Sequence, residues 1–180
     1  MNKNKLLLHI CCGPCACYPF KEFERKGYKI LGYWDNPNIH GYREYTKRHM
    51  ALGYYAHKMN DMELVEHEYD PEKWFESISD FSKPKRCSDC YKIRIHRTAE
   101  RAKQHKIKNF STTLLYSKFQ NHEEIKKICS SEAKKNELNF VYQDLRKGWK
   151  EGIKESKRMG IYRQQYCGCI FSERERYDVS

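Results

Sequence analysis

The clearest structural signal in the chain is the stretch Leu6-Leu7-Leu8-His9-Ile10-Cys11-Cys12-Gly13-Pro14-Cys15. Its first half has the length and the apolar content of a buried strand. Gly13 and Pro14 then turn the chain, and proline is favoured in the first turn of a helix. The stretch therefore predicts a strand, a cysteine-bearing turn, and a helix that ends near Gly27.

Predicted strands and helices alternate along the rest of the chain. We expect further strands at residues 28–34, 64–69, 109–115 and 138–145. We expect further helices at residues 41–59, 71–79, 88–105 and 148–159, a helix capped by Asn121, and a short one at residues 172–177. This alternation predicts a single α/β catalytic domain over residues 1–180, with a mostly parallel, five-stranded, Rossmann-like sheet and helices on both faces. An irregular, cysteine-containing tail follows the last long helix.

Ligands of parallel sheets bind beyond the carboxyl ends of the strands. The loops at residues 11–15, 35–39, 115–121 and 145–149 follow predicted strands, so we expect them to share one rim of the sheet. The site should lie there.

The net charge indicates a kind of partner, and the hydropathy argues against a membrane or secreted protein. The net charge of +11, with tyrosines interleaved among the basic residues, favours a polyanionic partner, most simply nucleic acid. No run approaches about 18 apolar residues, and the N-terminus lacks the apolar segment of a secretory signal. We therefore expect a cytoplasmic protein without a membrane segment.

The chain has nine cysteines, an odd number that excludes complete pairing within one chain. Without a secretion signal, clustered thiols are typical of metal or redox centres. Seven of them fall into three loop groups: Cys11, Cys12 and Cys15; Cys87 and Cys90; Cys167 and Cys169. Seven exceed one tetrahedral site, so we expect a four-thiolate [4Fe–4S] cluster beside a mononuclear iron or other metal with a position open to substrate. Cys17 and Cys129 are expected in the core.

Six motifs occur in an order that resembles the QueH-type epoxyqueuosine reductases over nearly the whole chain. They are Leu8-His-Ile-Cys-Cys-Gly-Pro-Cys15, Asn36-Pro-Asn-Ile39, Arg86-Cys-Ser-Asp-Cys-Tyr-Lys-Ile-Arg94, Thr112-Thr-Leu-Leu115, Asp144-Leu-Arg-Lys-Gly148 and Tyr162-Arg-Gln-Gln-Tyr-Cys-Gly-Cys-Ile-Phe-Ser172. The resemblance implies the last step of queuosine synthesis, in which the epoxide of epoxyqueuosine at the tRNA wobble position is reduced with iron–sulfur chemistry and without cobalamin. Many relatives carry Asp at the position of Cys15, which implies a ligand position that accepts a carboxylate or a thiolate.

The chain lacks the glycine fingerprint of flavin or nicotinamide binding, so electrons should come from an external reductase or ferredoxin-like donor. One partition of the ligands gives the cluster to Cys11, Cys12, Cys87 and Cys90, and the second metal to Cys15, Cys167 and Cys169. Exchanging Cys15 with Cys12 fits the sequence equally well. The candidate proton donors are Asp144, Tyr116 and Tyr166. The candidate tRNA-binding residues are Arg94, Arg146, Lys147, Arg163, Asn36 and Asn38, with Trp34 and Trp149 as possible stacking platforms.

Two other functions stay open at this point. A tRNA-thiolating or adenylating enzyme of related fold would need a phosphate-binding Ser-Gly-Gly-type loop after the first strand, and Cys11–Gly13 is a poor substitute. A zinc-stabilised RNA-binding module would explain the charge and the thiols, but it would not need seven clustered cysteines.

Overall fold

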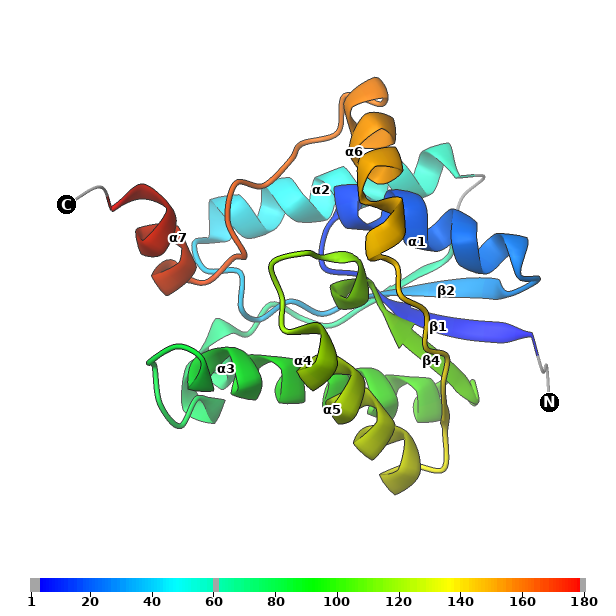
Figure 1. Ribbon diagram of the computed structural model, residues 1–180, viewed down its shortest axis with the longest axis horizontal. Helices are drawn as coiled ribbons and strands as arrows, with labels where there is room; N and C mark the ends of the chain where they lie inside the picture. The colour runs from blue at the N-terminus through cyan, green and yellow to red at the C-terminus, as the bar shows by residue number, and fades with distance from the viewer. Residues whose placement is uncertain (1–3, 60–61, 179–180) are drawn as a thin grey trace.

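The leucine run of the first motif lies in the central strand of a parallel sheet (Figure 1). The structure is a computed structural model that describes residues 4–59 and 62–178. The sheet has five strands in the order β3-β2-β1-β4-β5, and every neighbouring pair is parallel. The strands are β1 (Lys5–His9), β2 (Lys29–Trp34), β3 (Leu64–Glu66), β4 (Asn109–Thr112) and β5 (Asn139–Phe140).

Helices cover both faces of this sheet, as Figure 1 shows, with α1, α2 and α6 on one face and α4 and α5 on the other. The α-helices are α1 (Gly13–Arg25), α2 (Tyr42–Lys58), α3 (Pro71–Ser77), α4 (Lys85–Gln104), α5 (His122–Lys135), α6 (Trp149–Arg158) and α7 (Ile170–Tyr177). Two 3₁₀ turns, η1 (Thr113–Tyr116) and η2 (Arg146–Gly148), complete the described elements. The predicted α/β class with a parallel sheet is confirmed.

The strand order defines where a ligand binds. From β1 the chain runs outward through β2 and β3 on one side, then crosses to β4 and β5 on the other. The switch point of the topology therefore lies between β1 and β4, and its crevice opens beyond their carboxyl ends. Leu6, Leu7 and Leu8 have no exposed surface, because strands on both sides and helices on both faces enclose β1.

Three predicted strands are shorter than expected. The strand at 64–69 ends at Glu66, because its pairing with β2 stops at Trp34. The strand at 109–115 ends at Thr112, because the Thr112 hydroxyl accepts a hydrogen bond from Leu114 N (3.1 Å) and caps η1. The strand at 138–145 is reduced to Asn139–Phe140 at the edge of the sheet, where pairing with β4 covers only two positions.

The start of α4 was also predicted wrongly. The helix expected at residues 88–105 begins three residues earlier, at Lys85, and the Asp89 carboxylate accepts hydrogen bonds from the backbone N and the hydroxyl of Ser79 (3.1 and 2.6 Å). The predicted cap of α5 is confirmed, since Asn121 Oδ1 accepts from Glu124 N at 3.2 Å.

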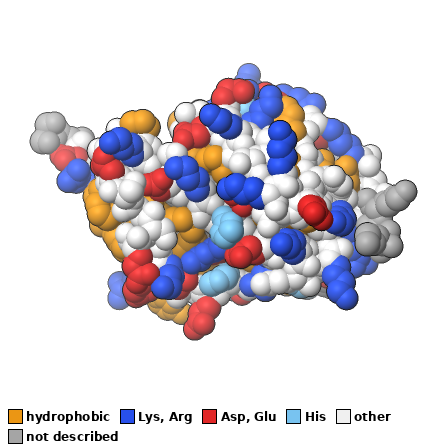
Figure 2. Space-filling model, turned by 90° about the horizontal axis from the view of Figure 1, so that it is seen from below, with side chains coloured by type: hydrophobic (Ala, Val, Ile, Leu, Met, Phe, Trp, Pro, Cys, Tyr) orange, Lys and Arg blue, Asp and Glu red, His pale blue; other side chains and the backbone are white. Residues whose placement is uncertain are grey.

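The surface carries charge of both signs. Figure 2 shows Lys and Arg side chains spread over the face that α3, α4 and α5 form, with acidic side chains among them. Within residues 4–59 and 62–178, no helix has the length and apolar character needed to cross a membrane.

Candidate metal centre

The loops that follow β1, β2 and β4 are tied together at the switch point. Cys11 N donates a hydrogen bond to Thr113 Oγ1 (3.0 Å), which joins the loop after β1 to η1. The Asn36 side chain donates to Ile10 O (2.9 Å) and brings in the loop after β2. The buried ring of His9 contacts Thr112 Oγ1 (2.8 Å) and Asp35 O (3.2 Å) beneath them. The predicted shared rim is therefore present for these three loops.

Three thiols gather at this point. The sulfur atoms of Cys11, Cys12 and Cys15 lie within 4.8 Å of one another. Cys12 is extended (φ −175°, ψ 161°) and directly precedes α1, so the chain turns between Cys11 and Cys15. The turn needs Gly13, because a Cβ at that position would lie 2.7 Å from the backbone oxygen of Ala51 on α2. Glycine thus lets α1 approach α2 closely while its first turn presents the thiols.

The three thiols differ in acidity. Hydrogen bonds from Cys12 and Cys15 lower the pKa of the Cys11 thiol well below its usual value. Burial raises the pKa of the Cys12 thiol well above it. Cys11 is therefore the first of the three to become a thiolate, which is the form that binds metal.

Gln164 is a residue of this site that sequence reasoning missed. Its Nε2 lies 2.8 Å from Cys12 Sγ and 3.5 Å from Cys15 Sγ. Its Oε1 is buried and has no hydrogen-bond partner among the described residues. The only signal in the sequence was its position three residues before Cys167, inside one of the six motifs.

The remaining four clustered cysteines form a second, wider group. Cys87 and Cys90 lie one turn apart at the start of α4, and Cys167 and Cys169 lie on the tail before α7. Cys90 and Cys169 are both buried in one cluster with Trp74. Burial raises the pKa of the Cys87 thiol, and the charges of Cys90 and Cys169 raise it further, as expected for neighbouring thiols. This arrangement differs from the partition expected from sequence, because Cys15 joins Cys11 and Cys12, and the tail cysteines approach α4.

Arg48 on α2 holds the tail in place across the rim. It is 2% exposed and donates to Cys167 O (2.8 Å) and Tyr166 O (3.2 Å), while its Nε pairs with Glu44 (2.6 Å). Gly168 has φ +145°, and a Cβ there would lie 2.9 Å from Asn38 Nδ2. In Figure 1 the tail descends from α6 past α2 to α7. A segment from the end of the chain thereby reaches the loop after β2.

Arg94 corrects a prediction. This candidate for tRNA binding is 2% exposed and donates to Asn36 Oδ1 at 2.6 Å, so its guanidinium does not face solvent. Burial disfavours its charge, but nearby Cys90, Cys11 and Cys167 raise its pKa. A buried cation therefore stands between the two thiol groups. Asn36 and Asn38 are also 2% exposed, so their side chains are not on the surface that a phosphate backbone would meet.

The three candidate acids have different environments. Asp144 is hydrogen-bonded to Arg146, which lowers its pKa to about 2, so at neutral pH it has no proton to donate. The buried hydroxyl of Tyr116 donates to Trp149 O at 3.1 Å. Tyr166 lies next to Cys167 with its ring 5.1 Å from the Arg48 guanidinium, and burial raises its pKa. Burial also raises the pKa of Tyr116, and the charge of nearby Cys15 raises it further, so both tyrosines keep their protons at neutral pH, but the Tyr116 hydroxyl already donates to Trp149 O.

The other candidate tRNA contacts divide by exposure. The side chains of Arg146 and Lys147 are 40% and 60% exposed, and Arg163 is half-buried. Trp34 has no exposed surface, so the expectation that it stacks on a base is wrong. Trp149 is partly buried against Tyr116. Cys17 and Cys129 are core residues, as predicted.

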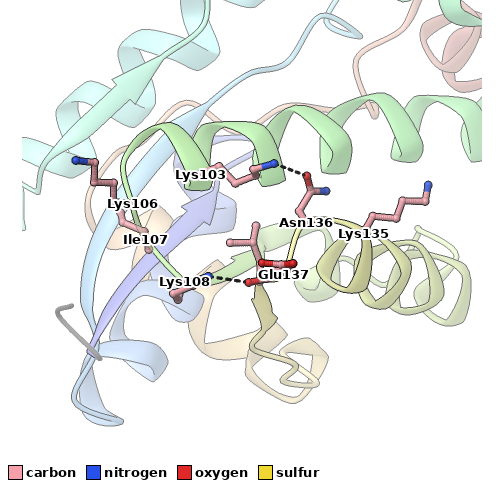
Figure 3. A pocket seen from close by; sticks show the side chains of 8 residues that line it. Lys103, Lys106, Ile107, Lys108, Lys135, Asn136 and Glu137 are labelled. Atoms are coloured by element: carbon pink, nitrogen blue, oxygen red, sulfur yellow. Dashed lines mark hydrogen bonds between the residues drawn. The ribbon is translucent and has the colours of Figure 1, made fainter.

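A hollow rich in lysine lies at the opposite edge of the sheet (Figure 3). It is lined by residues that precede β4 and β5, among them Lys103, Lys106 and Lys108. Lys103 reaches Asn136 Oδ1 at 3.5 Å, and Lys108 donates to Glu137 O at 3.1 Å. Because it borders the amino ends of the strands, this hollow is separate from the thiols.

Comparison with known proteins identifies the family. Residues 6–175 match the family model described as "Epoxyqueuosine reductase QueH". The chain is 37% identical over 175 residues to the epoxyqueuosine reductase QueH of Dehalococcoides mccartyi, with 96% of this chain and 94% of the relative covered. The protein of the same name from Thermotoga maritima is 35% identical over 180 residues, with 95% and 91% covered. That from Acinetobacter baylyi is 32% identical over 184 residues, with 97% and 83% covered. The chain therefore belongs to the epoxyqueuosine reductase QueH family of oxidoreductases.

Proposed function

We propose that this protein reduces the epoxide of epoxyqueuosine, at the wobble position of tRNA, to the cyclopentene diol of queuosine. The observation that carries the proposal is the group of three thiols at the switch point, with Gln164 of the tail against it. The relatives named epoxyqueuosine reductase support the choice of substrate. The thiols support a reaction driven by metal-based electron transfer.

The donor atoms fit two metal groups. Three thiols within 4.8 Å suit one soft metal ion with a coordination position left open. Cys87, Cys90, Cys167 and Cys169 suit a [4Fe–4S] cluster, in which each thiolate binds a different iron and the sulfur atoms stand further apart. Asn38 Oδ1, Arg94 Nε and Gln164 Oε1 are buried without partners among the described residues, which supports a further group in this region.

The reaction sets what the protein must supply. Conversion of an epoxide to an alkene consumes two electrons and two protons and releases the oxygen as water. Bound iron would supply Lewis acidity at the epoxide oxygen and a route for electrons from an external ferredoxin-like donor. Arg94 offsets the negative charge of the thiolates in a buried setting. Tyr166 is the proposed proton donor, because it keeps its proton and directly precedes Cys167 in the chain, whereas the Tyr116 hydroxyl donates to Trp149 O.

Binding of tRNA would use the exposed basic residues near the rim. Arg146, Lys147 and Arg163 are the proposed phosphate contacts, and the net charge of +11 supports a polyanionic partner. Arg94, Asn36 and Asn38 are assigned instead to the inner side of the site.

The proposal is tested with protein purified without oxygen. We expect a brown protein that contains iron and sulfide and converts epoxyqueuosine in tRNA to queuosine when a reductant is supplied. A colourless protein that contains only zinc and still binds tRNA would instead support an RNA-binding module.

Single cysteine substitutions test the two metal groups. Cys90→Ser and Cys169→Ser should lose the cluster absorbance, whereas Cys15→Ser should keep the absorbance and lose turnover. Cys129→Ser is the matched control, because Cys129 is a core thiol outside both groups. If Cys90→Ser and Cys169→Ser both retain iron, sulfide and colour, the assignment of the cluster is refuted.

A further inference from the structure

Phe119 is exposed to a degree that apolar packing does not explain. It is 82% exposed, the highest value among the large hydrophobic side chains of residues 4–59 and 62–178. Tyr42 and Met50 follow at 69% and 68%. Single exposed apolar side chains are common on protein surfaces, so the case for a ligand at Phe119 depends on its loop, its ring contact and its neighbours.

The loop that carries Phe119 is held on both sides. Phe119 N donates to Ser117 Oγ at 3.2 Å. On the other side, Gln120 Oε1 accepts from the Tyr91 hydroxyl at 2.9 Å, and Asn121 caps α5. The ring therefore projects from a backbone with little freedom, and binding to it would cost little ordering of the loop.

The ring is supported at its edge and open on its face. Trp149 meets Phe119 in an edge-to-face contact, with ring centroids 5.7 Å apart and an interplanar angle of 78°. Two other exposed aromatic side chains are already stacked, Phe75 on His40 and Phe81 on Phe171. Among the described residues, Phe119 has ring contact with Trp149 alone, so a planar partner can still stack on it.

This open ring stands beside the thiols. Gln120, the next residue, places its Nε2 3.7 Å from Cys167 Sγ. The loop follows η1 at the carboxyl edge of the sheet, where the thiol groups lie. Lys118 is exposed next to it in sequence, and Lys147 lies two residues before Trp149 with 60% of its side chain exposed. Basic side chains therefore accompany the aromatic ring, as in single-stranded nucleic-acid sites.

We propose that Phe119, supported by Trp149, is the stacking platform for an unpaired base of the tRNA loop next to the modified nucleotide. This inference rests on the proposed function and names the contact that orients its substrate. Proteins that recognise RNA loops stack splayed bases on aromatic side chains. Loss of such a contact costs about 1–3 kcal/mol per base, which is a loss of affinity of about 5- to 150-fold.

The test uses an anticodon stem-loop RNA with 2-aminopurine next to the wobble nucleotide, because stacking quenches the fluorescence of this base. The intact protein should quench it. Phe119→Ala should weaken binding by about 5- to 150-fold and abolish the quenching, while Phe119→Trp should keep both. Tyr54→Ala is the matched control, since Tyr54 is a 46% exposed aromatic residue on α2, and it should bind like the unchanged protein.

Iron content and thermal unfolding should change little in these variants, because neither substituted ring belongs to the buried core. If Phe119→Ala binds and quenches like the unchanged protein, or if Tyr54→Ala loses as much, the inference is overturned. If the unchanged protein neither binds the RNA nor reduces epoxyqueuosine in tRNA, the proposed function fails instead.

Discussion

Replacement of Arg48 by methionine tests whether the tail cysteines depend on a single buried cation. Arg48 is 2% exposed, pairs with Glu44 at 2.6 Å, and donates to the carbonyls of Tyr166 and Cys167. Arg48→Met keeps most of the side-chain volume and removes every one of these donors. Among the described residues, the Glu44 carboxylate would then keep the hydrogen bond from the Tyr162 hydroxyl, at 2.7 Å.

The expected cost follows from these contacts. Removal of one partner of a buried ion pair costs about 3–5 kcal/mol. Glu44 is 13% exposed, so water can partly solvate its carboxylate once Arg48 is removed. The loss of this ion pair should therefore cost about 3 kcal/mol, the lower end of that range. Hydrogen bonds from a charged donor contribute about 1.5–3 kcal/mol each, but contacts that share one side chain do not add in full. We expect Arg48→Met to lower the free energy of unfolding by about 3–5 kcal/mol.

The assay separates the fold from the tail. Urea unfolding gives the total loss, and hydrogen exchange of His40 N, which donates to Gly168 O at 3.0 Å, reports on docking of the tail. Arg48→Met should accelerate this exchange and lower the iron content. A second variant, Arg48→Met with Glu44→Gln, also removes the unpaired negative charge of Glu44 and should regain part of the lost stability. It should not restore tail docking, because the carbonyls stay without their donor.

Arg97→Met is the matched control. Arg97 is a partly buried arginine that pairs with Asp35 and Asp70, and among the described residues none of its ion pairs reaches the tail. It should destabilise the fold without faster exchange at His40 N. If Arg48→Met unfolds at the urea concentration of the unchanged protein, or if the double variant restores both exchange and iron, the reasoning about Arg48 is wrong.

Three further predictions concern packing, pH and salt. Gly13→Ala should destabilise the protein by about 1–3 kcal/mol in urea unfolding and lower its metal content, because the Cβ of the new alanine would meet the backbone of Ala51. Gly53→Ala is the control, since a Cβ at Gly53 has nothing within 4 Å, and it should be neutral or stabilising. Hydrogen bonds from Arg158 and Lys21 lower the pKa of Glu155 from 4.5 to about 2. The ionised carboxylate therefore stabilises the fold fully above pH 4.5, and this contribution is lost as the pH falls from 4.5 to 2. In thermal unfolding, Glu155→Gln should lose less stability over that pH range than the unchanged protein does. Affinity for tRNA should fall as the salt concentration rises. If Lys147 contacts one phosphate, Lys147→Gln should reduce the slope of log affinity against log salt concentration by about 0.7–0.9. An unchanged slope would mean that Lys147 is not part of the interface.

The sequence by itself determined the alternation of strands and helices and the position of the thiols on one rim. These features depend on local patterns. The apolar run before Cys11, the turn at Gly13 and Pro14, and the cap at Asn121 each act within a few residues, and parallel strands separated by helices leave few possible sheets. The lengths of the strands at 64–69, 109–115 and 138–145 were overestimated, because the first and third lie at the edges of the sheet and a side-chain cap at Thr112 ends the second.

Only the tertiary structure decided which thiols meet and which charges are buried. Cys12 and Gln164 are separated by 152 residues, and no spacing rule links them. Arg94 looks like a phosphate contact in a basic sequence, yet folding places it between two thiol groups without solvent around it. Burial and electrostatic neighbourhood are properties of the packed chain, since they depend on distances between residues that are remote in sequence. The residue types along the sequence therefore indicate which chemistry the site can carry out. The packing of the chain decides which of these residues act as ligands, which as counter-charge and which as acid.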